Sequence, residues 1–301
     1  MTITSSFDGL QLQAHLLAPE KPKAVIVLVH GMSEHKERYY PFMTWLAEMG
    51  YACLITDQRG HGATVTNPDD LGYFGKNALQ ALVEDTASVL RYAREQYPGL
   101  KVFLFGHSMG SMVVRAVLKR HPELMDGLMV CGSPSKNPAA GLGIFLTRLF
   151  RLFRGDRHRS MTIAVMMFGA YEMKFYKADG IHNAWLSTNK ANVEAYNNDP
   201  LCGFKFTLNG YRTVLQLMQD IYSPKGWVPA REELPVHFIA GSEDPCITSL
   251  KQFSKAVSFV RQMGYKTVTS KVYPGLRHEI LNEIGKEDVW RDAESVFASW
   301  L

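Results

Sequence analysis

The sequence has few cysteines and no long apolar run. Only four of its 301 residues are cysteine, and these four are scattered, which is typical of reduced thiols rather than of a disulfide framework. No stretch approaches the roughly 18 uninterrupted apolar residues of a membrane span. The first residues carry neither a basic segment nor an apolar segment, so no secretory signal peptide is expected. These absences together predict a soluble cytoplasmic protein.

A large excess of one charge is also lacking. The net charge is +4 and charged residues make up 21% of the chain, which gives no reason to expect a nucleic-acid partner. Repeats and low-complexity tracts are not visible either. The 46% of hydrophobic residues can fill one large core, or a core with a subdomain.

Buried-strand runs alternate with helical patterns along most of the chain. An Asp-Gly turn predicts a hairpin of two strands, and five apolar runs predict further strands. Residues 267–273 complete the sheet as its last strand. The eight predicted strands cover residues 2–7, 10–17, 24–30, 51–56, 102–105, 127–131, 234–241 and 267–273. This alternation predicts an α/β fold with a mostly parallel eight-stranded sheet flanked by helices.

The alternation stops after the sixth predicted strand. From about residue 135 to residue 227 the sequence shows only helical pieces and turns. The helical pieces are residues 142–153, 161–168, 189–196 and 211–222. We interpret 135–227 as a helical cap over the strand ends, and 1–134 with 228–301 as the core. A separate domain is the alternative, although no Pro/Ser-rich linker marks either junction.

The predicted cap is basic, with twelve Lys or Arg residues against six Asp or Glu residues between 135 and 226. Within it, residues 144–154 interleave arginines with large apolar side chains. One interpretation is a helix that packs its apolar side on the core and keeps its arginines in water. The other is transient docking on lipid aggregates with anionic head groups. Nothing in the sequence indicates an oligomeric state.

The strand at 102–105 runs into Gly-His-Ser-Met-Gly at residues 106–110, and a helical pattern follows. This pentapeptide pattern occurs by chance in roughly one chain of this length in ten, so its position between a strand and a helix decides the interpretation. Such a turn projects Ser108 at the sheet edge as a nucleophile. The Met109 N–H lies at the helix start, where an oxyanion is favoured. A serine in a surface turn is the alternative.

A serine nucleophile needs a base and a group that orients the base. In this kind of scaffold the chain order is serine, acid, histidine. Asp244 follows the strand at 234–241, and His278 follows the last strand, so we predict them as the acid and the base. The Met32 N–H, after the first parallel strand, is the predicted second oxyanion donor. Metal-ligand spacing is missing, so neither a metal nor an organic cofactor is expected.

These motifs together resemble the α/β-hydrolase family. They read His-Gly-Met-Ser-Glu-His at 30–35, Asp-Gln-Arg-Gly-His-Gly at 57–62, Gly-His-Ser-Met-Gly at 106–110, Glu-Asp at 243–244 and His-Glu at 278–279. More narrowly, the chain is similar to the monoacylglycerol lipase and bacterial lysophospholipase branch, which also holds serine aminopeptidase-type sequences. Cap residues 187–190 and 196–201 share in the likeness, which covers nearly the whole chain.

The resemblance implies hydrolysis of a carboxylic ester of a single-chain acyl lipid, a monoacylglycerol or a lysophospholipid, through an acyl-enzyme beneath the cap. It also implies that Glu34, Arg38 and Tyr196 bind the substrate head group. For Glu34 and Arg38 the alternative is a local salt bridge. Met32 and Ala63 depart from the branch, where smaller side chains and serine, respectively, are common.

Other functions stay open at this stage. An aminopeptidase-type hydrolase of short peptides would need paired cap carboxylates to hold the substrate ammonium group. Four are available but are not clustered in the sequence: Glu172, Asp179, Glu194 and Asp199. A general carboxylesterase or thioesterase is a further alternative. A binding protein on an inactive hydrolase frame is disfavoured by the intact serine, acid and histidine.

Overall fold

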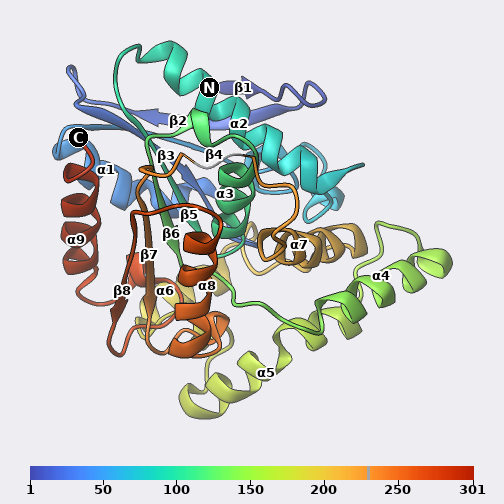
Figure 1. Cartoon of the computed structure of the whole chain (residues 1–301). Coiled ribbons are helices and arrows are strands. Elements are labelled where there is room, and N and C mark those ends of the chain that lie inside the picture. The colour runs from blue at the N-terminus through green and yellow to red at the C-terminus, as the bar shows by residue number, and fades with distance from the viewer. Residues whose placement is uncertain (229–230) are drawn as a thin grey trace.

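A computed structural model describes residues 1–228 and 231–301, and over these residues the chain forms an eight-stranded sheet in the order β1-β2-β4-β3-β5-β6-β7-β8 (Figure 1). The strands are β1 Thr2–Thr4, β2 Gln11–Leu17, β3 Ala24–Val29, β4 Tyr51–Thr56, β5 Val102–His107, β6 Gly127–Cys131, β7 Val236–Gly241 and β8 Val268–Tyr273. Residues 229 and 230 belong to the expected second core segment and lie outside the described residues.

The strands from β4 to β8 pair in parallel, whereas β1 pairs with β2, and β2 with β4, in antiparallel orientation. The predicted α/β class is therefore confirmed. The first strand is shorter than the predicted 2–7, because the chain turns at Ser5. The Ser5 hydroxyl donates to Asp85 Oδ1 at 2.5 Å, and its carbonyl accepts from the Gly9 N–H at 3.0 Å.

Helices cover both faces of the sheet, as β3 illustrates. Val25, Val27 and Val29 pack in one apolar core, and the alternate residues Ile26 and Leu28 pack in a second core on the other face. Side chains of α1 and α9 complete the second core, and those of α2, α3 and α8 complete the first. These helices are α1 Tyr40–Glu48, α2 Ala78–Gln96, α3 Met109–Arg120, α8 Leu250–Gln262 and α9 Lys286–Ala298.

Among the described residues, four α-helices lie between β6 and β7, where the helical insertion is expected: α4 Ala140–Arg154, α5 Met161–Asp179, α6 Lys190–Asn198 and α7 Leu208–Ile221. Helices α4 and α5 project from the body of the molecule (Figure 1). Helix α7 instead packs against α2 and α3, and α4 packs on α7. The insertion is thus tied to the core through α7. Among the described residues, no helix is both long and apolar enough to cross a membrane.

Helix α5 is longer than the predicted 161–168. It begins where the Ser160 hydroxyl accepts from the Ile163 N–H at 3.3 Å, and it ends at Gly180, whose φ is +71°. Large apolar side chains occur on its buried and exposed sides alike, as Phe175 and Met173 show. Such a helix has no single apolar stripe, so its periodicity does not reveal its length.

Candidate active site

Ser108 lies at the sharp turn between β5 and α3, with φ +54° and ψ −118°. A non-glycine residue rarely adopts a positive φ, and such strain is typical of functional turns. The turn depends on two flanking glycines. A β-carbon on Gly106 would lie 2.6 Å from the Gly110 carbonyl oxygen, and one on Gly110 would lie 2.2 Å from the Val29 carbonyl oxygen. Only glycine at both positions lets α3 approach the strands this closely.

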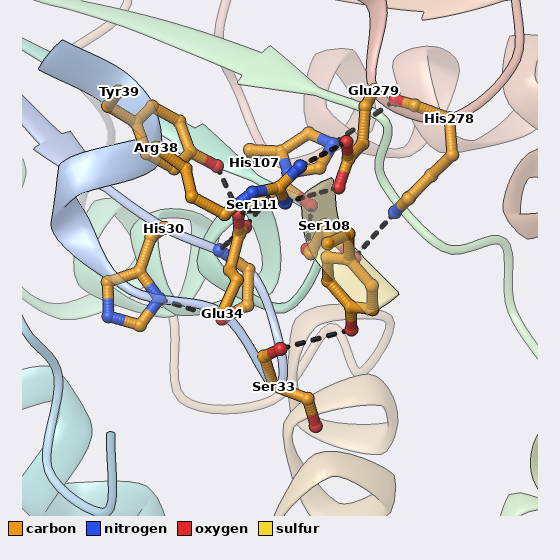
Figure 2. A network of polar contacts seen from close by, with 12 residues as sticks. His30, Ser33, Glu34, Arg38, Tyr39, His107, Ser108, Ser111, His278 and Glu279 are labelled. Atoms are coloured by element: carbon orange, nitrogen blue, oxygen red, sulfur yellow. Dashed lines mark hydrogen bonds and ion pairs between the residues drawn. The ribbon is translucent and has the colours of Figure 1, made fainter. Parts of the chain in front are cut away.

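The structure brings the three residues predicted as nucleophile, base and acid together. His278 Nε2 lies 2.8 Å from Ser108 Oγ, and His278 Nδ1 lies 3.0 Å from both carboxylate oxygens of Asp244 (Figure 2 shows the Ser108 contact). His278 and Asp244 are buried. Burial lowers the pKa of His278, but the Asp244 carboxylate outweighs it and leaves the pKa above its ordinary value. The arrangement can pull a proton from the serine hydroxyl.

Asp244 is itself held in place by the short turn that follows it. Its Oδ1 accepts from the Cys246 N–H at 2.8 Å. The Cys246 Sγ lies 4.0 Å from His278 Nε2, and burial raises the pKa of this thiol well above its ordinary value. Cys246 is therefore a neutral neighbour of the imidazole rather than a rival nucleophile.

The two predicted oxyanion donors lie on either side of Ser108. Met109 is the first residue of α3, and Met32 follows Gly31, on which a β-carbon would lie 3.1 Å from the Ser108 β-carbon. Within the described part of the chain, neither amide donates to a backbone carbonyl or a side chain. Both side chains line the same cavity as Ser108 and His278. The geometry suits an oxyanion hole, and the assignment stays a prediction.

Glu34 and Arg38 meet in a network of polar contacts that includes Glu279, the residue after His278 (Figure 2). Arg38 donates to Glu34 Oε2 at 3.0 Å and to both oxygens of Glu279 at 2.6 and 2.7 Å. Glu34 Oε1 also accepts from the Gly31 N–H at 2.5 Å and from the Tyr39 hydroxyl at 2.9 Å. These contacts match the salt-bridge alternative for Glu34 and Arg38.

Glu34 carries a stable negative charge in this network. Burial raises the pKa of Glu34, but a hydrogen bond with His107 and the charge of Arg38 outweigh it, so its pKa falls well below the usual range. Tyr196 from α6 donates its hydroxyl hydrogen to the Ser33 carbonyl at 3.0 Å, and its ring stacks beneath the Arg38 guanidinium at 4.9 Å. Glu34 and Tyr196 line the large cavity as well, so a role in substrate binding stays a prediction.

A cavity of about 920 Å³ opens above Ser108, between the sheet edge and the inserted helices. Its size falls within the range of sites for small molecules. Methionine, aromatic and aliphatic side chains dominate its walls. They include Met32, Met109, Met112, Met161, Met166, Met167, Met218, Phe168, Tyr171, Trp185, Val214 and Leu215. Flexible thioether side chains adapt their shape to apolar ligands.

Three neighbours of His278 were not predicted from the sequence. The Trp185 ring, from the one-turn helix Ala184–Leu186, lies 5.2 Å from the His278 ring. His107 Nε2 lies 3.2 Å from the His278 carbonyl oxygen. Glu279 holds Arg38, as described above. The Gly-x-Ser-x-Gly pattern already contained His107, and the His-Glu motif at 278–279 contained Glu279, although neither pattern indicated these contacts. No local pattern marks Trp185.

Over residues 1–228 and 231–301, two groups of side chains each bring three potential metal-ligating atoms close together: Asp244 with Cys246 and His278, and His35 with Asp199 and Cys202. In the first group, the imidazole already joins Asp244 to Ser108. In the second, His35 Nε2 lies 2.8 Å from Asp199 Oδ2. In each group the histidine and the carboxylate are thus already engaged with each other.

Comparison with known proteins gives a consistent result. A family model described as serine aminopeptidase, S33, matches residues 20–285. The chain is 26% identical over 295 residues to the monoacylglycerol lipase of Mycolicibacterium smegmatis, covering 97% of this chain and 95% of that protein. It is 25% identical over 282 residues to the phospholipase YtpA of Bacillus subtilis, covering 92% and 95%.

A solved structure is similar over almost the full length. The thermostable carboxyl esterase from Bacillus coagulans, in complex with glycerol, superposes with a TM-score of 0.88 at 26% sequence identity. The similarity covers 99% of this chain and 97% of the esterase.

Proposed function

The chain belongs to the serine aminopeptidase S33 family of α/β-hydrolases, and from this premise we propose that it hydrolyses carboxylic esters of single-chain acyl lipids. The observation that carries the proposal is the 2.8 Å contact between Ser108 Oγ and His278 Nε2 at the base of a large apolar cavity. The substrates we propose are monoacylglycerols and lysophospholipids.

In this proposal Ser108 Oγ attacks the ester carbonyl while His278 Nε2 takes the hydroxyl proton. Asp244 keeps the imidazole in the required tautomer and stabilises its positive charge. The N–H groups of Met32 and Met109 receive the negative oxygen, and each such donor typically contributes about 3 kcal/mol. The alcohol leaves with the proton from His278, and water then hydrolyses the acyl-enzyme.

The cavity supports an aliphatic substrate. Its methionine-rich wall offers a flexible apolar surface and few charges, which suits an acyl chain. The names of the relatives agree with this choice, because they include a monoacylglycerol lipase and a phospholipase. The esterase that superposes on the chain was solved with glycerol, the alcohol that a monoacylglycerol would release.

The aminopeptidase alternative receives less support. Of the four candidate carboxylates named for this alternative, Glu172 alone lines the cavity in the described part of the chain, and it already contacts His182 Nδ1 at 2.6 Å. Asp179 pairs with Arg277, and Asp199 with His35. A free pair of carboxylates for a substrate ammonium group is therefore not assembled among the described cap residues.

We further propose that residues 135–227 act as the cap and that α4 contacts a lipid surface. Leu152 and Phe153 are each 78% exposed at the end of α4, beside the exposed Arg151 and Arg154. Leu142 is exposed on α4 and also lines the cavity. An apolar patch that continues to the cavity mouth gives an acyl chain a route out of the lipid phase.

For the compartment we propose the cytoplasm. The four cysteines are all buried and unpaired, an arrangement that suits a reducing environment.

Hydrolysis rates test the proposed function directly. We expect the protein to hydrolyse monoacylglycerols or lysophospholipids faster than alanine or proline anilides, and to be labelled stoichiometrically by a fluorophosphonate. Ser108→Ala should lose both properties. Preferential cleavage of the anilides would instead support the peptidase alternative, and a wild-type protein that no fluorophosphonate labels would contradict a serine hydrolase.

A further inference from the structure

The loop that carries His278 is fastened to the inserted segment by one buried carboxylate. Glu283 is 1% exposed. Its Oε1 accepts from the Arg277 N–H at 2.8 Å, so it fixes the residue directly before His278. Its Oε2 accepts from the Ser187 hydroxyl at 2.8 Å, from the Thr188 hydroxyl at 2.5 Å and from the Thr188 N–H at 2.9 Å.

These donors explain why a carboxylate stands at this position. In the described part of the chain no Lys or Arg side chain pairs with Glu283. The Arg277 guanidinium binds Asp179 and the Ala184 carbonyl instead. Within this part of the chain, the two carboxylate oxygens accept from N–H and O–H donors alone. A carboxylate offers two acceptor oxygens and about four lone-pair directions, whereas an amide would turn an NH₂ group toward donors. Hydrogen bonds to an ionised acceptor are also stronger than neutral ones.

The same segment holds His278 from its other side. The Glu279 N–H donates to the Leu186 carbonyl at 2.7 Å, so the amides before and after His278 are both fixed. The Trp185 ring packs against the His278 ring at 5.2 Å. Residues 184–189 of the insertion and the loop that carries His278 are therefore packed together as one unit. Glu283 links them, because it binds residues 187 and 188 of the insertion and residue 277 of the loop.

We propose that Glu283 is a positioning residue: it sets the orientation of His278 toward Ser108 and links that orientation to residues 184–189 of the insertion. The inference rests on the proposed function, because it assumes that His278 is the base. Glu283 touches neither the substrate nor the reacting atoms. It acts through the backbone of Arg277 and through the segment that carries Trp185.

The test compares Glu283→Gln with Glu287→Gln, an exposed glutamate on α9. With p-nitrophenyl butyrate, Glu283→Gln should lower kcat about 10- to 100-fold, because small misplacements of a catalytic group have effects of that size. KM should stay within about twofold, since Glu283 itself does not line the cavity. The rate of fluorophosphonate labelling of Ser108 should fall by the same factor as kcat. Glu287→Gln should match the wild type in all three measurements.

A purely structural role gives a different result. If Glu283→Gln lowers the midpoint of thermal unfolding but keeps the wild-type kcat and labelling rate well below that temperature, the inference is wrong. If Glu283→Gln fails to fold, Thr188→Val tests the same positioning role, because it removes one hydroxyl donor to Glu283 and leaves the carboxylate in place. We expect it to lower kcat several-fold at constant KM, and an unchanged kcat would overturn the inference.

The labelling rate separates this inference from the proposed function. It reports the activation of Ser108 by His278, whichever ester is the substrate. If the wild-type protein is labelled but does not hydrolyse acyl lipids, the proposed substrate is wrong and the Glu283 comparison still stands.

Discussion

Arg38 binds Glu279, the residue that follows His278, through two guanidinium nitrogens at 2.6 and 2.7 Å. The same guanidinium reaches Glu34 at 3.0 Å and Asn192 of α6 at 3.0 Å. One cation, whose side chain is only 10% exposed, thus joins the loop after β3, the His278 loop and the inserted helices. Its loss would leave two buried carboxylates without a cationic partner.

Arg38→Met should therefore destabilise the fold strongly. Removing one member of a buried ion pair typically costs about 3–5 kcal/mol, because the remaining charge is left uncompensated. The measurement is the free energy of unfolding in urea. Arg291→Met is the matched control, because Arg291 pairs with Asp288 on the exposed face of α9, and it should change stability by less than about 0.5 kcal/mol. Equal stability of the two variants would contradict the network described for Arg38.

The pH dependence of kcat/KM should show an acid limb above pH 6.5. His278 must be neutral to accept the Ser108 proton, and its pKa is raised above the ordinary value of 6.5. Activity should therefore fall as the pH decreases through this raised pKa. In Asp244→Asn the carboxylate that raises the pKa is gone, so the limb should move to lower pH, and kcat should fall about 10⁴-fold. A limb that stays in place in Asp244→Asn would contradict the assigned partner.

Gly110→Ala should destabilise the protein by about 3 kcal/mol or more, since it drives a methyl group into the Val29 carbonyl. Gly141→Ala on α4 is the control. Its new β-carbon would meet only the Gln219 side-chain amide at 3.3 Å, and alanine is favoured over glycine within a helix by about 1 kcal/mol. Thermal unfolding of both variants measures the difference. If Gly110→Ala unfolds at the same temperature as the wild type, the claim that α3 lies too close to the strands for a β-carbon at residue 110 is wrong.

Charge reversal should separate the two interpretations of α4. We expect Arg148→Glu/Arg151→Glu/Arg154→Glu to lose co-sedimentation with anionic vesicles, because basic residues near such a surface contribute about 1 kcal/mol each. The control reverses three exposed lysines outside the insertion, Lys21, Lys76 and Lys255, and should still bind. Hydrolysis of a water-soluble ester should be unchanged in both. Unaltered binding of the arginine variant would exclude this surface as the docking site.

The positions of Ser108, Asp244 and His278 could be predicted because the fold orders them along the chain. Each follows a strand of a parallel sheet, and the carboxyl ends of such strands meet at one edge. The strands β3 to β7 could be predicted from their continuous apolar runs, because both faces of these strands are buried.

Other parts of the site carry no local signal. Glu283 and Thr188 are 95 positions apart, and neither stands in a pattern that predicts the other. The contact between Trp185 and His278 likewise depends on how the inserted segment folds back. Contacts between residues so far apart in the sequence depend on tertiary packing, and the periodicity of a strand or helix does not predict them. The length of α5 was missed because its apolar residues lie on several sides.

Within the described part of the chain, seven of the fourteen methionines line the cavity above Ser108. A mild oxidant converts the thioether to a polar sulfoxide. The cavity wall that contacts an acyl chain would then be less apolar. Met161 and Met166 are more than half exposed and should react first. Peroxide treatment should therefore weaken turnover of long-chain esters before it affects short-chain esters, and a methionine sulfoxide reductase should restore what was lost.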